Sequence, residues 1–226
     1  MRVAILLPCL NEADALPAVL AGLAPAVRDG ARVIVCDNGS TDGSREIARS
    51  LGANIATETR RGYGGAVLAG IAAITGDPPD VVVMMDADHS NYAEDLPALL
   101  GPILRGEAEL VLGERMTLGD VRALTPQQRA GNALATALIR ARTGRAYRDL
   151  GPFRAIRWEA LRGLAMEDQT WGWNVEMQIK AVRRGLRVVE VPVRNRARIG
   201  ESKISGTVSG VVRAGAKIVW ACWRYG

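Results

Sequence analysis

The chain has 226 residues, the size of one large domain, and hydrophobic residues make up 48% of it. That fraction is enough to bury a full core. The formal net charge is +5, and a basic excess points to nucleic acid, an anionic membrane surface or a phosphorylated ligand. No lysine-rich run marks a nucleic-acid-binding arm, so we expect no nucleic acid partner.

The cysteines and the apolar segments bear on the compartment. Cys9, Cys36 and Cys222 are odd in number and lack C-x-x-C spacing, so a reducing compartment fits better than a disulfide framework. The apolar start is too short for a signal peptide, and no stretch reaches the length of a transmembrane span. We expect a cytoplasmic protein, with peripheral association at the inner face of the membrane as an open alternative.

Strands and helices alternate through the first half. Apolar runs predict strands at residues 2–8, 31–37, 53–58, 80–86 and 108–114, and amphipathic or small-residue segments predict helices at 12–27, 42–51, 64–75 and 92–104. This alternation is typical of βαβ units and a parallel sheet. Near-continuous apolar strands indicate burial on both faces.

The regular alternation of strands and helices ends after Glu114. Helices are predicted at 125–142 and 171–184, a strand running into a helix at 153–161, and a strand at 186–193. The last segment, 205–225, reads as an amphipathic helix with Trp220 and Trp223 beside its basic side. Such a helix either lies at a membrane interface or packs on the protein, and we favour packing.

Polar clusters follow four of the predicted strands: "PCLNE", "CDNGSTDGS", "TRRGYGG" and "DADHS". In an open α/β sheet, ligands bind beyond the carboxyl ends of the strands. Asp86 and Asp88 stand one residue apart at such an end, where their repulsion is unfavourable unless water or a cation absorbs it. Each cluster alone has a structural explanation as a strand stop, a capped turn or a glycine contact, but four on one rim indicate a site.

Two common nucleotide-binding motifs are not present. A dinucleotide-binding Rossmann site needs glycines directly after the first strand, where this chain has Pro8, Asn11 and Glu12. A P-loop is also missing.

Four segments resemble, in their order and spacing, the inverting GT-A glycosyltransferases of family 2: "LLPCLNE", "VIVCDNGSTDGS", "RRGYGGAVLAG" and "VVVMMDADHS". The nearest branch holds dolichyl-phosphate mannose synthases and polyprenyl-phosphate glucosyltransferases, and the resemblance continues through "RDLGPFRA" and "RIGESKISG". It implies an α/β GT-A fold, a single domain with a Rossmann-like, mostly parallel central sheet flanked by helices. Residues 1–204 would form the glycosyltransferase domain, with a nucleotide-sugar half (1–115) and an acceptor half (116–204), and 205–226 the C-terminal amphipathic helix.

The resemblance also implies roles for individual residues. Asp86 and Asp88 match the metal-binding D-x-D, with Mg²⁺ or Mn²⁺ as cofactor, and Asp88 also counts as catalytic. Asp37 matches the acid that contacts the base. Donor contacts are implied for the following residues: Pro8, Leu10, Glu12, Asp37, Gly62, Asp86, Ala87, Arg115, Arg198 and Lys203. Asp149 and Arg154 fall in a segment that reads D-x-S-G-F-R in relatives but "DLGPFR" here, which leaves the acceptor open.

Two positions beside the D-x-D bear on metal binding. Ser90 stands where many relatives have a metal-binding glutamine. His89, the only histidine, is either a metal ligand or an exposed turn residue, and we favour the turn.

The acceptor decides whether a base is needed. A phosphate monoester is mostly dianionic at neutral pH and needs little help to attack, and Arg129, Arg154 and Arg198 are candidates to hold it. A hydroxyl acceptor needs a general base, for which Asp149, Asp168 and Glu176 are candidates. Trp171 and Trp173 either stack on a sugar or pack in the core.

The sequence therefore predicts a metal-dependent inverting glycosyltransferase. It would move a hexose from a nucleotide sugar, of the GDP-mannose or UDP-glucose type, to a polyprenyl or dolichyl phosphate. Transfer to a soluble hydroxyl or phosphorylated metabolite is the alternative. A nucleotidyltransferase is disfavoured because no glycine- and lysine-rich loop follows the first strand, and the complete D-x-D argues against a non-catalytic sugar-nucleotide-binding protein.

Overall fold

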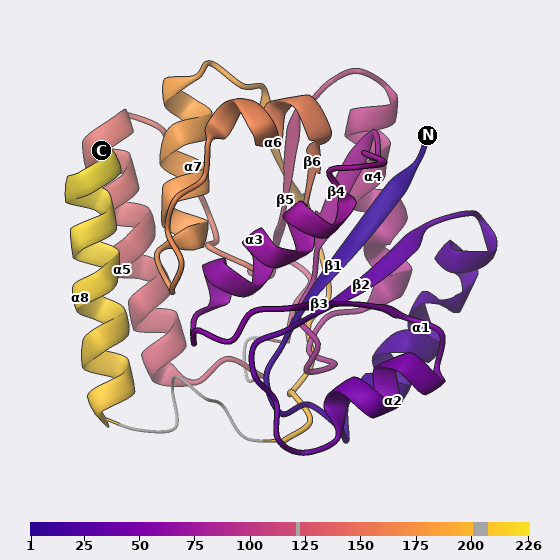
Figure 1. Cartoon of the computed structure of the whole chain (residues 1–226). Coiled ribbons are helices and arrows are strands. Elements are labelled where there is room, and N and C mark those ends of the chain that lie inside the picture. Colours follow the sequence, from indigo (N-terminus) through magenta and orange to yellow (C-terminus); the bar gives the residue numbers. More distant parts are fainter. Residues whose placement is uncertain (121–122, 201–207) are drawn as a thin grey trace.

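A seven-stranded sheet runs through the centre of the computed structural model (Figure 1). The structure describes residues 1–120, 123–200 and 208–226, the side chains of 208–214 excepted. The strands lie in the order β3-β2-β1-β4-β6-β5-β7. Their bounds are β1 (Val3–Cys9), β2 (Arg32–Asp37), β3 (Asn54–Thr57), β4 (Val81–Met84), β5 (Leu110–Glu114), β6 (Arg154–Arg157) and β7 (Val188–Pro192).

The sheet is mostly parallel, as predicted. β1 pairs in parallel with β2 and β4, while β6 lies antiparallel between β4 and β5. β6 and β7 come from the second half of the chain, so both halves contribute strands to one sheet within a single domain. The predicted division at residue 115 therefore does not separate two independent sheets.

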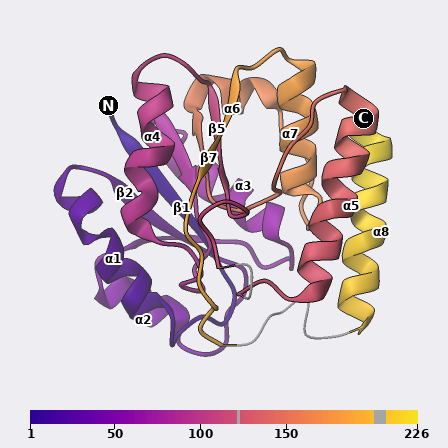
Figure 2. The same cartoon turned by 180° about the vertical axis from the view of Figure 1, so that it is seen from behind.

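Helices cover both faces of the sheet (Figures 1 and 2). One face carries α1 (Leu16–Arg28), α2 (Ser44–Ser50) and α4 (Leu96–Leu104), the last preceded by the 3₁₀ helix η1 (Ala93–Asp95). The other face carries α3 (Tyr63–Ile74), α6 (Trp158–Leu164) and α7 (Trp173–Arg183). Two further helices, α5 (Pro126–Thr143) and α8 (Val208–Tyr225), stand side by side and pack against α7.

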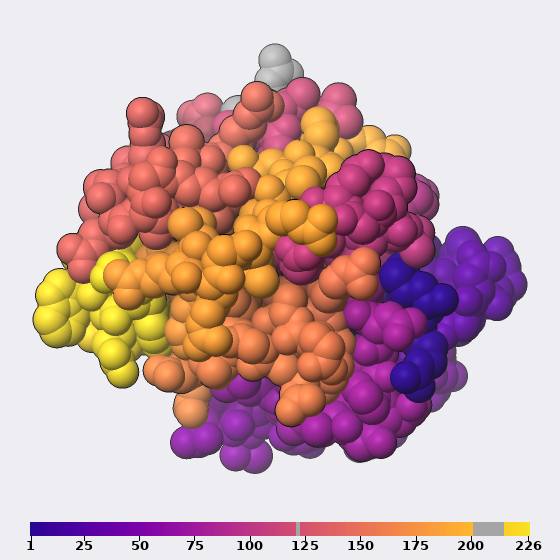
Figure 3. Space-filling model, turned by 90° about the horizontal axis from the view of Figure 1, so that it is seen from above, coloured from indigo at the N-terminus to yellow at the C-terminus, as the bar shows by residue number. Residues whose placement is uncertain are grey.

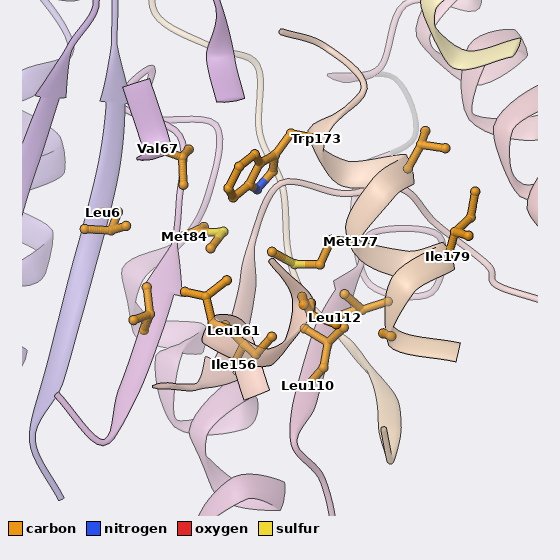
Figure 4. Close-up of a cluster of buried hydrophobic side chains, with 14 of the residues drawn as sticks. Leu6, Val67, Met84, Leu110, Leu112, Ile156, Leu161, Trp173, Met177 and Ile179 are labelled. Atoms are coloured by element: carbon orange, nitrogen blue, oxygen red, sulfur yellow. The ribbon is translucent and has the colours of Figure 1, made fainter. Parts of the chain in front are cut away.

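Alternate residues of each central strand enter two separate cores. In β1, Leu6 points to the α3 side and Leu7 to the α1 side, and both are fully buried. Figure 4 shows the first of these cores, where Met84 of β4 lies between Leu6 of β1 and the side chains of Trp173 and Met177 of α7. Each such side chain contributes roughly 1.5–3 kcal/mol by leaving water. The two cores hold the strand ends, and hence the polar loops beyond them, in place.

Local sequence explains most helix and strand ends. α5 begins with a capping box, in which Thr125 accepts a hydrogen bond from the Gln128 N–H and the Gln128 side chain accepts one from the Thr125 N–H. β4 ends at Met84, two residues earlier than predicted, because the Asp86 N–H donates to the Asn91 side chain. Asp86 and Asp88 therefore stand in a turn rather than on the strand.

The C-terminal helix packs on the protein, the alternative that the sequence favoured. Ala221, Cys222 and Tyr225 are buried against the body of the molecule, and Lys217 forms an ion pair with Asp168 at 2.7 Å. α8 begins at Val208, and the predicted start at 205 lies outside the described residues. Within the part of the chain that is described, no helix is both long enough and apolar enough to cross a membrane.

Candidate active site

A cavity of about 1260 Å³ opens beyond the carboxyl ends of β1 and β4. Most of the predicted donor-site residues line it: Pro8, Leu10, Glu12, Gly62, Asp86, Ala87, Asp88, Arg115 and Arg198. Four predicted residues do not line it, namely Asp37, Asp149, Arg154 and Asp168. Lys203 lies outside the described residues.

Arg198 connects two carboxylates at the donor end of this cavity. Its guanidinium lies 2.6 Å from Glu12 Oε1 and 3.3 Å from Asp88 Oδ2. The segment is held there by a hydrogen bond from the Ile199 N–H to the Asp88 carbonyl at 2.9 Å. The cation thus neutralises acids supplied by two different strand ends, β1 and β4.

The D-x-D carries negative charge that its surroundings do not fully offset. Burial, followed by the charge of Asp88, raises the pKa of Asp86 to about 7. No three His, Cys, Asp or Glu side chains among the described residues are grouped so as to hold a metal ion. Two carboxylates one residue apart fit Mg²⁺ or Mn²⁺ when diphosphate and water oxygens complete the coordination.

His89 and Ser90 lie on different sides of the D-x-D turn. Ser90 lines the main cavity, whereas His89 lines a separate small cavity beside α1. His89 has a left-handed backbone conformation, with φ of 65°, and burial followed by Arg196 lowers its pKa. This geometry agrees with a turn residue rather than a metal ligand.

Arg115 and Asp149 form a paired contact at the cavity wall. The Arg115 Nε and Nη2 donate to the two Asp149 oxygens at 2.7 and 2.8 Å, and the Arg115 N–H donates at 3.0 Å. Although burial would raise the pKa of Asp149, these bonds and the charge of Arg115 hold it below its usual range. Asp149 is therefore poorly suited to act as a base and instead orients Arg115, which faces the cavity.

Arg154 is fully buried, and it does not reach the cavity. Its guanidinium donates to the Gly151 carbonyl and lies 3.6 Å from Met177 Sδ. Burial lowers its pKa to about 10. Arg154 is therefore not placed to contact an acceptor phosphate in the cavity, contrary to the expectation from the sequence.

Asp168 organises a loop instead of facing the cavity. One of its oxygens accepts hydrogen bonds from the N–H groups of Thr170 and Gly172, and the other pairs with Lys217 of α8. Glu176, also buried, accepts from the N–H groups of Glu167 and Asp168. Both candidate bases are thus occupied in fixing residues 167–172.

The loop at 167–172 contacts the glycine segment before α3. The N–H groups of Gly64 and Gly65 donate to the carbonyls of Thr170 and Gln169 at 3.1 and 2.8 Å. A Cβ on Gly64 would stand 1.9 Å from the Asp168 carbonyl oxygen. The glycines that looked like helix-packing positions therefore allow two loops to meet at the cavity edge.

Asp37 supports the neighbouring turn. It is fully buried and accepts hydrogen bonds from the N–H groups of Gly39 and Ser40. The next residue, Asn38, does line the cavity, and its side chain accepts from the Gly62 N–H and donates to the Arg60 carbonyl. Asn38 was visible only as part of "CDNGSTDGS", and no spacing rule singled it out.

The far end of the cavity lies between α5, α8 and the 167–172 loop. Its apolar lining includes Leu134, Leu150, Pro152, Trp171 and Ile218. Trp173 is fully buried and packs in the core, whereas Trp171 lines the cavity. Arg61, Arg196 and Lys217 also line the cavity and were not singled out from the sequence, although "RNRAR" at 194–198 shows an arginine at every second position.

The fold matches solved glycosyltransferase structures. Glucosyl-3-phosphoglycerate synthase from Mycobacterium tuberculosis, in complex with Mn²⁺, uridine diphosphate and glucosyl-3-phosphoglycerate, superposes with a TM-score of 0.77. The match covers 98% of this chain and 80% of that one at 23% identity. This likeness shows that the chain has the GT-A fold.

The sequence comparisons identify the family. Residues 4–164 match the Glycosyl transferase family 2 model, and the chain belongs to that family. It is 38% identical over 213 residues to an uncharacterized glycosyltransferase of Mycobacterium tuberculosis, covering 94% of both chains. It is 35% identical to the undecaprenyl-phosphate mannosyltransferase of Micrococcus luteus, covering 93% of this chain and 90% of that one.

Proposed function

We propose that the chain transfers a hexose from a nucleoside-diphosphate sugar to a polyprenyl phosphate, with inversion at the anomeric carbon. The observation that carries this proposal is the distribution of charge in the cavity. Among its described lining residues the only carboxylates are Glu12, Asp86 and Asp88, all at the donor end. Among the described residues, the far end thus has no lining carboxylate to serve as a base, which favours an acceptor that is already ionised.

The lining of the far end supports an isoprenoid acceptor. Leu134, Leu150, Pro152 and Ile218 offer apolar contacts, and an isoprenoid chain is stabilised by leaving water against such side chains. The Tyr63 hydroxyl and Asn174 Oδ1 are buried without a hydrogen-bond partner among the described residues, and both residues line the cavity. These groups are available to sugar or phosphate oxygens.

The reaction needs no proton transfer from the protein. An acceptor phosphate oxygen attacks the anomeric carbon, the new C–O bond forms as the bond to the diphosphate breaks, and the nucleoside diphosphate departs with the electron pair. Arg198 and Arg115 supply fixed positive charge where the leaving group becomes more negative. The Arg115 Nη1 takes no part in hydrogen bonds between described residues, and we assign it to the ligand.

A divalent cation at Asp86 and Asp88 would neutralise charge on the diphosphate. The relative bound to Mn²⁺ and uridine diphosphate supports this cofactor, and the undecaprenyl-phosphate mannosyltransferase supports the acceptor class. We assign Asp37, Asp149, Arg154 and Asp168 to positioning roles, because each is buried and engaged by other groups. GDP-mannose and UDP-glucose both remain candidate donors.

A transfer assay tests the proposal. The purified protein is incubated with radiolabelled GDP-mannose or UDP-glucose, with Mn²⁺, Mg²⁺ or a chelator, and with a short-chain polyprenyl phosphate in detergent. We expect metal-dependent transfer of label into the organic phase. Parallel reactions contain 3-phosphoglycerate or free sugars, and label confined to those water-soluble products would refute the lipid acceptor.

A matched pair of variants connects the activity to the site. Asp88→Asn keeps the shape of the side chain and removes its charge, so metal-dependent turnover should collapse. Asp77→Asn makes the same change at an exposed ion pair with Arg2 outside the cavity, and it should keep full activity. Full metal-dependent turnover by Asp88→Asn would contradict the metal assignment.

A further inference from the structure

The outward sides of α5 and α8 form one exposed, mostly apolar surface, here named the α5–α8 face. The two helices contact each other and stand at one end of the molecule in both views (Figures 1 and 2). From above, α8 (yellow) projects on this flank beside α5 (Figure 3). The exposed residues of the face are Ala130, Ala133, Leu134, Ala137 and Ala141 of α5 with Ala216, Val219, Trp220 and Trp223 of α8.

Two large side chains of this face, Val219 and Trp223, are exposed on the side of α8 opposite its packed residues. α8 already buries Ala221, Cys222 and Tyr225 on its inner side. On the outer side Trp223 is 70% exposed and Val219 50% exposed. The stripe Ala216, Val219, Trp220 and Trp223 has the spacing of one helical face. The Trp220 ring also contacts Lys217 and Tyr225 of the same helix, so Val219 and Trp223 are the most exposed large apolar side chains of this second side of α8.

The charge of the two helices is one-sided. They contain six basic residues and no acidic one, while the whole chain has a net charge of +5, so the rest has a net charge of −1. Lys217 pairs with buried Asp168 at 2.7 Å, whereas Arg224 lies 3.9 Å from Glu167 and both of these side chains are exposed. Arg129 and Arg140 of α5 are both exposed.

The far end of the main cavity reaches this face. Ala130 and Leu134 belong both to the exposed surface and to the cavity lining, and Gly215 and Ile218 of α8 line the cavity beside them. A molecule that entered between α5 and α8 would therefore approach the D-x-D from this side.

We propose that the α5–α8 face docks on the surface of an anionic lipid bilayer. Tryptophan is favoured at the membrane–water interface, and a basic, amphipathic surface is attracted to anionic headgroups. The proposal extends the proposed function, since a polyprenyl phosphate would be delivered at the same face, but docking itself does not depend on catalysis.

Other occupants fit the face less well. A second copy docked face to face would oppose two surfaces that both carry basic and no acidic residues, which is unfavourable. A nucleic acid would satisfy the arginines but leave the apolar stripe without a partner. An anionic bilayer satisfies both features at once.

Vesicle flotation tests the docking directly, with the full chain and no substrate. Vesicles of phosphatidylcholine alone are compared with vesicles that also contain phosphatidylglycerol. We expect binding to the anionic vesicles that weakens as salt is added. Val219→Ser/Trp223→Ser and, separately, Arg140→Glu should each lower the affinity about tenfold or more.

Matched controls change equally exposed residues elsewhere. Leu51→Ser/Leu104→Ser alters side chains that are 50% and 62% exposed, directly after α2 and at the end of α4. Arg49→Glu reverses an exposed charge on α2. Both controls should bind vesicles as the unaltered chain does.

Three results would overturn the proposal: no binding to anionic vesicles, unaltered binding by both face variants, or equal losses in the controls. A dimer in light scattering that Val219→Ser/Trp223→Ser dissociates would assign the face to a second copy instead. Failure of the transfer assay with normal vesicle binding would refute the acceptor and leave the docking intact.

Discussion

Replacing Asp149 by asparagine separates a positioning role from a catalytic one. The asparagine keeps the shape of the side chain but turns one acceptor into an NH₂ group that faces the donors of Arg115. Three hydrogen bonds converge on the Asp149 carboxylate from Arg115 at 2.7–3.0 Å. Breaking a buried ion pair costs about 3–5 kcal/mol, and because the Arg115 side chain is 17% exposed, solvent reduces the cost to about 2–3 kcal/mol.

That loss is large enough to measure by thermal unfolding. For a chain of this length it lowers the unfolding midpoint by roughly 5–10 °C. We also expect a higher KM for the donor, because Arg115 loses its orientation toward the cavity. Since the folded-state pKa of Asp149 is lowered, the stability advantage of the unaltered chain is complete above the ordinary carboxyl pKa and disappears as pH falls through the lower folded value.

Asp95→Asn is the matched control for Asp149→Asn. Asp95 also accepts from the N–H, Nε and Nη2 of one arginine, Arg194, but that arginine is 45% exposed. The control should change the midpoint much less and leave donor KM unaltered. If Asp149→Asn unfolded at the midpoint of the unaltered chain and lost only kcat, Asp149 would be a base and the positioning argument would fail.

Three other changes test separate contacts. Gly64→Ala should destabilise the fold by about 1–3 kcal/mol in denaturant unfolding, because its Cβ would meet the Asp168 carbonyl at 1.9 Å, whereas Gly163→Ala has no atom within 4 Å and should not destabilise it. Mn²⁺ affinity, measured by titration calorimetry, should increase as pH rises through about 7, since Asp86 binds the ion only when deprotonated, and a flat profile would contradict this. Lys217→Met should speed hydrogen exchange at residues 167–172, because it removes the ion-pair partner of Asp168. Arg224→Met breaks only a 3.9 Å exposed contact with Glu167 and should leave the exchange rate unchanged. Equal exchange rates in the two variants would contradict the role of Lys217.

Residues at strand ends could be placed from the sequence because parallel strands put their carboxyl ends on one rim. Pro8, Glu12, Asp86 and Asp88 line one cavity for that reason. The second half was harder to read, because its charged groups are defined by partners distant in sequence. Arg115 meets Asp149 and Lys217 meets Asp168 across 34 and 49 positions, contacts that no local pattern reveals.

The sequence also did not reveal which charged side chains are buried. Arg154 was a candidate to hold the acceptor phosphate and Asp168 a candidate base, and both roles need a side chain that reaches the cavity, whereas both residues are buried. The structure stabilises Asp168 with backbone N–H groups and Lys217, and leaves Arg154 with a carbonyl and a sulfur as partners. Burial also separates Trp171 from Trp173. Trp171 lines the cavity, whereas Trp173, two residues later, is buried in the core.

The place of β6 between β4 and β5 has a consequence for how the chain folds. β4 and β5 are close in sequence, yet neither can complete its hydrogen-bonding edge until residues 154–157 arrive between them. A nascent chain of which only the first 115 residues have left the ribosome therefore exposes β4 as an open sheet edge. Open edges can pair with strands of other chains. Because of this strand order, the donor half can complete its sheet only after the acceptor half has been synthesised. A chain truncated before β6 should therefore aggregate rather than persist as a soluble nucleotide-binding fragment.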